Sequence, residues 1–190
     1  MSKSRLMIGL ILLLLVVLVT SAVLYIRPTE QHDLSFSTIS WQDKLKGMAE
    51  TRRAEIIITE QEVNQLAKKE LVEYQANNPL PVEVSGADFR LYGNRLTSEM
   101  NVNRGFIEAG ITANFRLNYS SGKLVLYPES MAVRGISLSP ETVGLEPVEI
   151  NLQEYLPDVV KVEEVEFLGK SIKLKFSLDW LEVARYLNLL

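Results

Sequence analysis

The chain has 190 residues, a formal net charge of −4, no cysteine and one histidine. The lack of thiols excludes cysteine nucleophiles, cysteine–zinc centres and disulfides, and a single histidine argues against serine–histidine catalysis and histidine-rich metal centres. The acidic balance argues against a nucleic-acid partner, which needs a basic surface. We therefore expect a protein that is not an enzyme, with no catalytic residue, no cofactor and no metal site.

An uncharged apolar run covers residues 6–26, where only Thr20, Ser21 and Tyr25 carry polar side-chain groups. As a helix it would extend roughly 30 Å, the thickness of the hydrocarbon core of a bilayer. The run predicts a single transmembrane anchor. A cleaved signal peptide, cut near Ala22, remains the alternative, and in both cases the rest of the chain is exported.

The charges that flank this run predict its orientation. Lys3 and Arg5 precede it, whereas only Arg27 follows it directly. Lysine and arginine favour the cytoplasmic side, so we expect a cytoplasmic tail at residues 1–5 and an extracytoplasmic domain in a single-pass protein of the cell membrane. Without Lys3 and Arg5, 18 basic residues remain against 24 acidic ones, which does not favour adhesion to anionic lipid.

A polar linker, residues 27–40, follows the run and contains the lone histidine, His32, which we expect to be solvated. One domain, residues 41–190, comes next. It begins with a short helix at residues 41–49 and a strand at residues 54–58. The sequence from Thr59 to Glu62 then fits a capping box that opens the main amphipathic helix, residues 60–76.

Alternating polar and apolar residues dominate from Val82 onward. The clearest strand is Ile107–Tyr119, with apolar residues at every second position. Expected after it are a strand from Lys123, a short strand at residues 147–152, a hairpin at residues 159–168 and 171–178, and a terminal helix at residues 180–189. The predicted fold class is α+β: an N-terminal transmembrane helix, then a long curved antiparallel sheet packed on one main helix.

Three carboxylates stand close together at Glu163, Glu164 and Glu166. Such a group can bind calcium or act as an acid–base pair. The lysines around it favour a different interpretation, in which cross-strand ion pairs cover a solvated face. These lysines are Lys161, Lys170, Lys173 and Lys175.

The apolar row of Ile107–Tyr119 permits two interpretations. It can be ordinary core, or it can line a groove that accepts an acyl chain between the sheet and the main helix. The candidate lipid-binding residues are Val63, Leu66, Leu71, Ile107, Ile111, Phe115 and Leu117.

The order of segments resembles a known family. An N-terminal anchor and linker are followed by TEQEVNQL at residues 59–66, VSGADFRLYGNRLTSEMNVN at residues 84–103 and GKLVLYPESMAVRGISLSP at residues 122–140. This pattern resembles the YpmS-like small membrane proteins of Gram-positive bacteria and, more distantly, tubular lipid-binding (TULIP-like) domains. The resemblance implies a bent sheet wrapped on a long helix, with an apolar ligand.

The sequence thus predicts a membrane-anchored, extracytoplasmic, non-enzymatic domain that binds a lipid or another apolar envelope component in a groove between sheet and helix. The alternative is an envelope protein–protein interaction module with a filled core. A hydrolase that uses the Glu163–Glu166 carboxylates is a third hypothesis. The expected partners are accordingly the membrane, a lipid ligand or an envelope protein.

Overall fold

A computed structural model describes residues 3–187, with side chains from residue 11 onward. The side chains of the predicted tail, residues 1–5, and the predicted end of the last helix at Leu189 lie outside the described residues.

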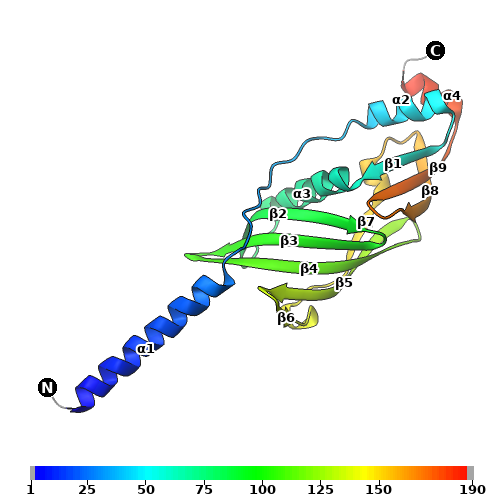
Figure 1. Cartoon of the computed structure of the whole chain (residues 1–190). Helices are drawn as coiled ribbons and strands as arrows, with labels where there is room; N and C mark the ends of the chain where they lie inside the picture. Colours follow the sequence, from blue (N-terminus) through cyan, green and yellow to red (C-terminus); the bar gives the residue numbers. More distant parts are fainter. Residues whose placement is uncertain (1–2, 188–190) are drawn as a thin grey trace.

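The first helix, α1 (Lys3–Ile26), projects away from the rest of the molecule (Figure 1). Its apolar side chains from Ile11 to Val19 are each 54–61% exposed. Over the part of the chain that the structure describes, none of the helices combines the length and apolar character needed to cross a membrane. The membrane anchor therefore stays a prediction.

The remaining elements form an α+β domain, as predicted. The helices are α2 (Trp41–Thr51), α3 (Glu60–Asn77) and α4 (Trp180–Tyr186), with short 3₁₀ turns η1 (Glu141–Val143) and η2 (Leu152–Tyr155). The strands are β1 (Glu55–Thr59), β2 (Glu83–Tyr92), β3 (Arg95–Arg104), β4 (Ile107–Ser120), β5 (Lys123–Val133), β6 (Ile136–Leu138), β7 (Val148–Asn151), β8 (Val160–Phe167) and β9 (Ser171–Leu178). Each predicted strand and helix of the domain has a counterpart among these elements, and the last helix is described only as far as Tyr186.

Two antiparallel sheets contain these strands. The large sheet has the order β2-β3-β4-β5-β6, and β7 pairs with the first half of β5 on the edge that β6 shares. The small sheet has the order β1-β9-β8. Helices α2 and α4 contact each other at the end of the domain opposite α1 (Figure 1).

The hydrophobic core lies where the two sheets and α2 meet. Leu45 of α2, Leu91 of β2 and Val183 of α4 are at most 1% exposed. Each occupies an apolar position of its amphipathic element, so the alternation of the strands and the spacing of the helices turn these side chains inward together. The core therefore occupies the half of the molecule far from α1.

Helix α3 lies along the free edge of β2, and its polar side chains bind the backbone of that edge. The N–H groups of Val84, Phe89 and Leu91 donate to Gln75 Oε1 (2.7 Å), Asn64 Oδ1 (3.0 Å) and Glu60 Oε2 (2.9 Å), respectively. Exposed strand edges invite pairing with other chains. These three bonds satisfy donors of the β2 edge within the chain itself.

This placement corrects the expected packing of the main helix. The main neighbours of α3 are β2, β1 and β9, so the helix does not cross the middle of the large sheet over β4. Tyr74 continues the helical spacing of the apolar residues Val63, Leu66 and Leu71, yet it is 56% exposed. The polar residues of α3 are needed for the β2 edge, and this turns part of its apolar stripe away from the sheet.

The capping box that opens α3 generates a prediction about pH. Partial burial acts to raise the pKa of Glu62, but hydrogen bonds from Lys44 and Thr59 and the charge of Lys44 hold it below its usual value. The Lys44 Nζ–Glu62 Oε1 distance is 2.8 Å. The stabilisation by the Glu62 carboxylate is therefore complete above the unfolded pKa of roughly 4.3 and is lost as pH falls through the lower folded pKa.

We expect Glu62→Gln to lower the free energy of unfolding by about 1 kcal/mol at neutral pH, with the difference shrinking toward zero in acid. Denaturant unfolding of the full chain at several pH values, followed by tryptophan fluorescence, measures this. Glu73→Gln is the control, because Glu73 is 53% exposed and its pair with Lys69 contributes little. A difference that grows in acid would contradict the assignment.

Candidate functional site

The seven predicted lipid-binding residues fall into two groups. Phe115 and Leu117 are 9% and 3% exposed and belong to the packed core, and Val63 and Leu66 pack against that core. Leu71, Ile107 and Ile111 are half-buried and lie outside the core cluster. The structure therefore does not bring all seven together around one space.

The burial of β4 changes along its length. Ala113, Phe115 and Leu117 are buried, whereas Ile107, Ala109 and Ile111 on the same face are half-buried. Just before the strand, Phe106 in the β3–β4 turn is 89% exposed. The apolar row thus passes from the packed core to an open end, and that end lies nearest α1 (Figure 1).

The last turn of α1 is attached to the same end of the sheet. Arg134, in the β5–β6 turn, donates from Nε to the carbonyl oxygen of Tyr25 (2.8 Å). The Tyr25 hydroxyl donates to the Arg134 carbonyl oxygen (3.4 Å), and the guanidinium lies 5.7 Å from the centre of the tyrosine ring. These contacts hold the end of α1 beside β4 and β5.

The linker crosses the polar face of the sheet over a row of small side chains. Gly86, Asn101 and Gly110 are neighbours across β2, β3 and β4. A Cβ at Gly86 would lie 2.0 Å from the His32 carbonyl oxygen, and one at Gly110 would lie 3.0 Å from Pro28 Cα. Only glycine leaves room for backbone this close. Asn101, between the two glycines, is 2% exposed.

Polar contacts fix the linker in this position. Ala87 N–H donates to the Asp33 carbonyl oxygen (3.3 Å), and Lys68 Nζ lies 3.4 Å from Asp33 Oδ1. Farther along, Ser37 N–H donates to Gln65 Oε1 (2.6 Å). The His32 side chain is only 14% exposed, so the expectation of a solvated histidine is wrong. Residues 28–37 are a docked segment of the fold and not only a spacer.

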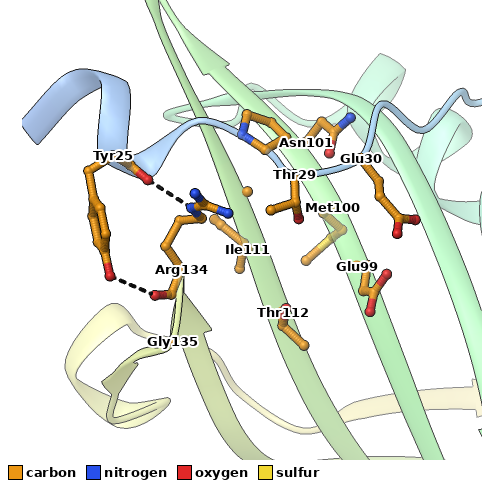
Figure 2. Close-up of a pocket in the computed structure, with 12 residues that line it drawn as sticks. Tyr25, Thr29, Glu30, Glu99, Met100, Asn101, Ile111, Thr112, Arg134 and Gly135 are labelled. Atoms are coloured by element: carbon orange, nitrogen blue, oxygen red, sulfur yellow. Dashed lines mark hydrogen bonds between the residues drawn. The ribbon is translucent and has the colours of Figure 1, made fainter.

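A cavity of about 460 Å³ lies between the linker and the sheet (Figure 2). Glu30 of the linker, Glu99, Asn101 and Thr112 of the sheet, and Arg134 of the β5–β6 turn are among the residues that border it. Its size falls within the range of small-molecule sites. Its border is mainly polar and so differs from the predicted acyl-chain groove, although Ile111 borders it too.

Charged groups form a chain at one side of this cavity. His32 Nε2 lies 3.6 Å from Glu99 Oε2, which also lies 3.5 Å from the guanidinium of Arg90. The hydrogen bond of Arg90 to Asp88, together with the charges of Glu99, Asp88 and Glu30, raises the pKa of Arg90 above its usual value. Three acidic groups therefore surround one arginine and the only histidine of the chain.

A second cavity, of about 410 Å³, lies at the start of α3. Glu60, Asn64, Asp88, Arg90 and Lys170 are among the residues that border it. None of the seven predicted lipid-binding residues borders this second cavity. Phe89 is the one large apolar residue among those that border it.

The predicted ion pairs with the acidic run are confirmed for Lys173 and Lys175, whereas Lys170 pairs with Glu60. Glu164 lies opposite Lys175 and Glu166 opposite Lys173 in the β8–β9 register, with Nζ–carboxylate distances of 3.0 and 3.1 Å. Lys175 also pairs with Glu166. Hydrogen bonds from these two lysines lower the pKa of Glu166. The two carboxylates thus serve a charged surface of the small sheet.

The linker site escaped prediction because its parts are distant in sequence. Residues 27–40 show no periodicity, and a lone histidine in a polar segment has no local partner. The available clue was Gly86 within a strand, since an isolated strand glycine often marks a close approach of another backbone. The sequence alone does not indicate that this backbone is the linker.

Gly86 therefore offers a test of the docked linker. We expect Gly86→Ala to displace the linker, because the added Cβ would collide with the His32 carbonyl group. The free energy of unfolding should fall by about 1–3 kcal/mol, and a glutamate-specific protease should cut faster at Glu30. Gly47→Ala is the matched control, because nothing lies within 4 Å of a Cβ there. Unchanged cleavage and stability in Gly86→Ala would contradict the docked arrangement.

Comparison with known proteins adds no relative: no family model, no curated protein and no solved structure matches the chain. The functional argument therefore rests on the residues and contacts described above.

Proposed function

We propose that this protein is a membrane-anchored, extracytoplasmic, non-enzymatic domain that binds the acyl chain of a lipid at the end of the large sheet nearest α1. The chain would lie along the half-buried part of the β4 row, at Ile107, Ala109 and Ile111. Phe115 and Leu117, which the sequence places in the same groove, would instead form its closed inner end.

The observation that carries this proposal is the gradient of burial along β4. The row is closed at Phe115 and half-open at Ile111 and Ile107, and Phe106, in the turn just before the strand, is 89% exposed. Ala109 stands between Ile107 and Ile111 on the same face and leaves room beside them. An apolar surface that opens at one end, and is sealed by core at the other, suits a hydrocarbon chain that enters from that end.

The position of α1 supports the same ligand. The uncharged apolar sequence of residues 6–26 predicts a membrane span. The contacts between Tyr25 and Arg134 hold the end of α1 beside the open end of the β4 row. A span at α1 would therefore place the opening next to lipid, at a high effective concentration. The resemblance to YpmS-like and TULIP-like proteins agrees with this proposal.

A second candidate function is an envelope protein–protein interaction module. The packed state of Phe115 and Leu117 favours it, because these residues have no free surface for a ligand. The edge strand β6 is exposed along its length and offers a place for another strand to pair.

Photocross-linking distinguishes these proposals. We expect the full chain in nanodiscs that contain a diazirine-bearing phospholipid to cross-link at α1 and also at peptides that contain residues 107–111. Ile111→Glu should reduce the yield of cross-links at residues 107–111 at least about 10-fold, because a charged side chain in the row makes contact with an acyl chain unfavourable. Mass spectrometry of the digested protein measures both sets.

Ile57→Glu is the matched control. Ile57 is 48% exposed on β1, in the small sheet, so its replacement adds the same charge outside the proposed groove. Cross-links confined to α1 would overturn the lipid site and leave the anchor intact. A chain without cross-links at α1 would overturn the anchor. One dominant cross-linked protein from cell membranes, without lipid at residues 107–111, would favour the interaction module.

A further inference from the structure

We propose that the linker and the large sheet together form a binding site for a divalent transition-metal ion, with zinc as the best fit. The donors are the carboxylate of Glu30, the imidazole of His32 and the carboxylate of Glu99. The proposal is independent of lipid binding. It also departs from the sequence-based expectation of no metal site.

The three donors converge in space. One possible ligand atom from each of Glu30, His32 and Glu99 lies within 4.8 Å of the others. Two ligands that are each about 2.1 Å from a zinc ion are at most about 4.2 Å apart. Small side-chain rotations suffice to close this difference, and Glu30, which is exposed, has the freedom to make them.

The docked linker explains why the donors meet. Residues Glu30 and His32 are two apart in an extended segment, so their side chains project to the same side. The close approach at Gly86 and Gly110 presses this segment against the sheet. Glu99 lies on β3, two residues before Asn101 and therefore on the same face of the strand. The backbone positions are thus set by packing that does not involve the donors.

Asn101 gives an independent indication of a ligand. Its side-chain Nδ2 is buried and has no hydrogen-bond partner among the described residues, and the residue is 2% exposed. It borders the same cavity as Glu30 and Glu99 (Figure 2). A buried amide without a partner is costly. In the proposed site, a water bound to the metal would be the acceptor that this N–H lacks, as partners outside the ligand set are in metal sites.

The donor set selects the class of ion. One imidazole and two carboxylates suit zinc and neighbouring transition metals, whereas calcium and magnesium prefer oxygen ligands alone. The charges agree, because the carboxylates of Glu30, Glu99 and Asp88 outnumber the two arginines near them, Arg90 and Arg134. A divalent ion would offset the excess of negative charge.

The consequence of binding would be a fixed connection between α1 and the domain. Two donors belong to the linker and one to β3, so the ion would join segments that are separated by more than 60 residues in sequence. Any ligand that binds only the docked state stabilises that state. Metal would therefore protect the linker from cleavage and hold the domain in one orientation relative to α1.

The test uses the full chain in detergent, purified without a histidine tag and stripped with a chelator. We expect one zinc ion per chain, measured by competition with a chromophoric chelator. Because His32 is the only histidine, zinc should also shift a single imidazole resonance in a ¹⁵N-histidine spectrum. His32→Asn and Glu99→Gln should each weaken binding at least about 10-fold, and calcium should not compete.

Glu30→Gln tests the site in a chain that should remain folded, because Glu30 is exposed and contributes nothing to the core. It should weaken zinc binding while circular dichroism stays unchanged. Glu129→Gln is the matched control, since Glu129 pairs with Arg95 and Arg116 elsewhere on the sheet, and its zinc affinity should equal that of the parent chain. Absence of saturable binding at micromolar zinc, or equal binding by His32→Asn, would overturn the proposal.

Discussion

The passage of the linker across the polar face of the large sheet is the contact on which the arrangement of the molecule depends. Two glycines, Gly86 and Gly110, allow the linker backbone to lie almost directly on the strands, and Asp33 then bonds to both β2 and α3. Apart from this passage, α1 meets the domain through the Tyr25–Arg134 contacts and its contacts with β4. The linker is therefore a packed part of the fold and not only a covalent connection between α1 and the domain.

The large sheet performs different tasks at its two ends. At the end far from α1 it is a wall of a closed core, with Leu91, Leu96 and Phe115 facing the small sheet. At the end near α1 one face carries the docked linker, and the other carries the half-buried residues of β4. A long strand can have two environments because its side chains alternate between the same two faces along its whole length, while different elements cover those faces at each end. Core packing and the proposed ligand binding would thus occupy different parts of one strand.

Most of the fold follows from local patterns. The capping box at Thr59 and Glu62, the hairpin at residues 159–168 and 171–178, and the alternation from Ile107 each depend on a few neighbouring residues, and each lies where it was predicted. The position of α3 along the β2 edge could not be predicted in this way. It depends on the hydrogen bond from the Phe89 N–H to Asn64 Oδ1, and no periodic sequence pattern in either segment predicts this bond.

Local sequence patterns predict even less of the candidate sites, which depend on contacts between distant segments. The β4 row was recognised in the sequence, but its division into closed and open parts depends on what covers it. His32 was interpreted as solvated because its sequence neighbours are polar, whereas its actual neighbour is Glu99 on β3. The row of Gly86, Asn101 and Gly110 exists only through the register of three strands. Contacts of this kind require the folded chain.

The way the linker lies on the sheet also has a mechanical consequence. It crosses β2, β3 and β4 instead of pairing alongside one of them, and its first fixed point, Pro28, follows directly on α1. Tension applied through α1 would therefore reach the attachments one at a time, first at Arg134, then at Gly110, then at Gly86 and Ala87, before it reached the core. The linker would peel away at low force while the two sheets stayed folded, and it would give the domain a reversible extension of its reach.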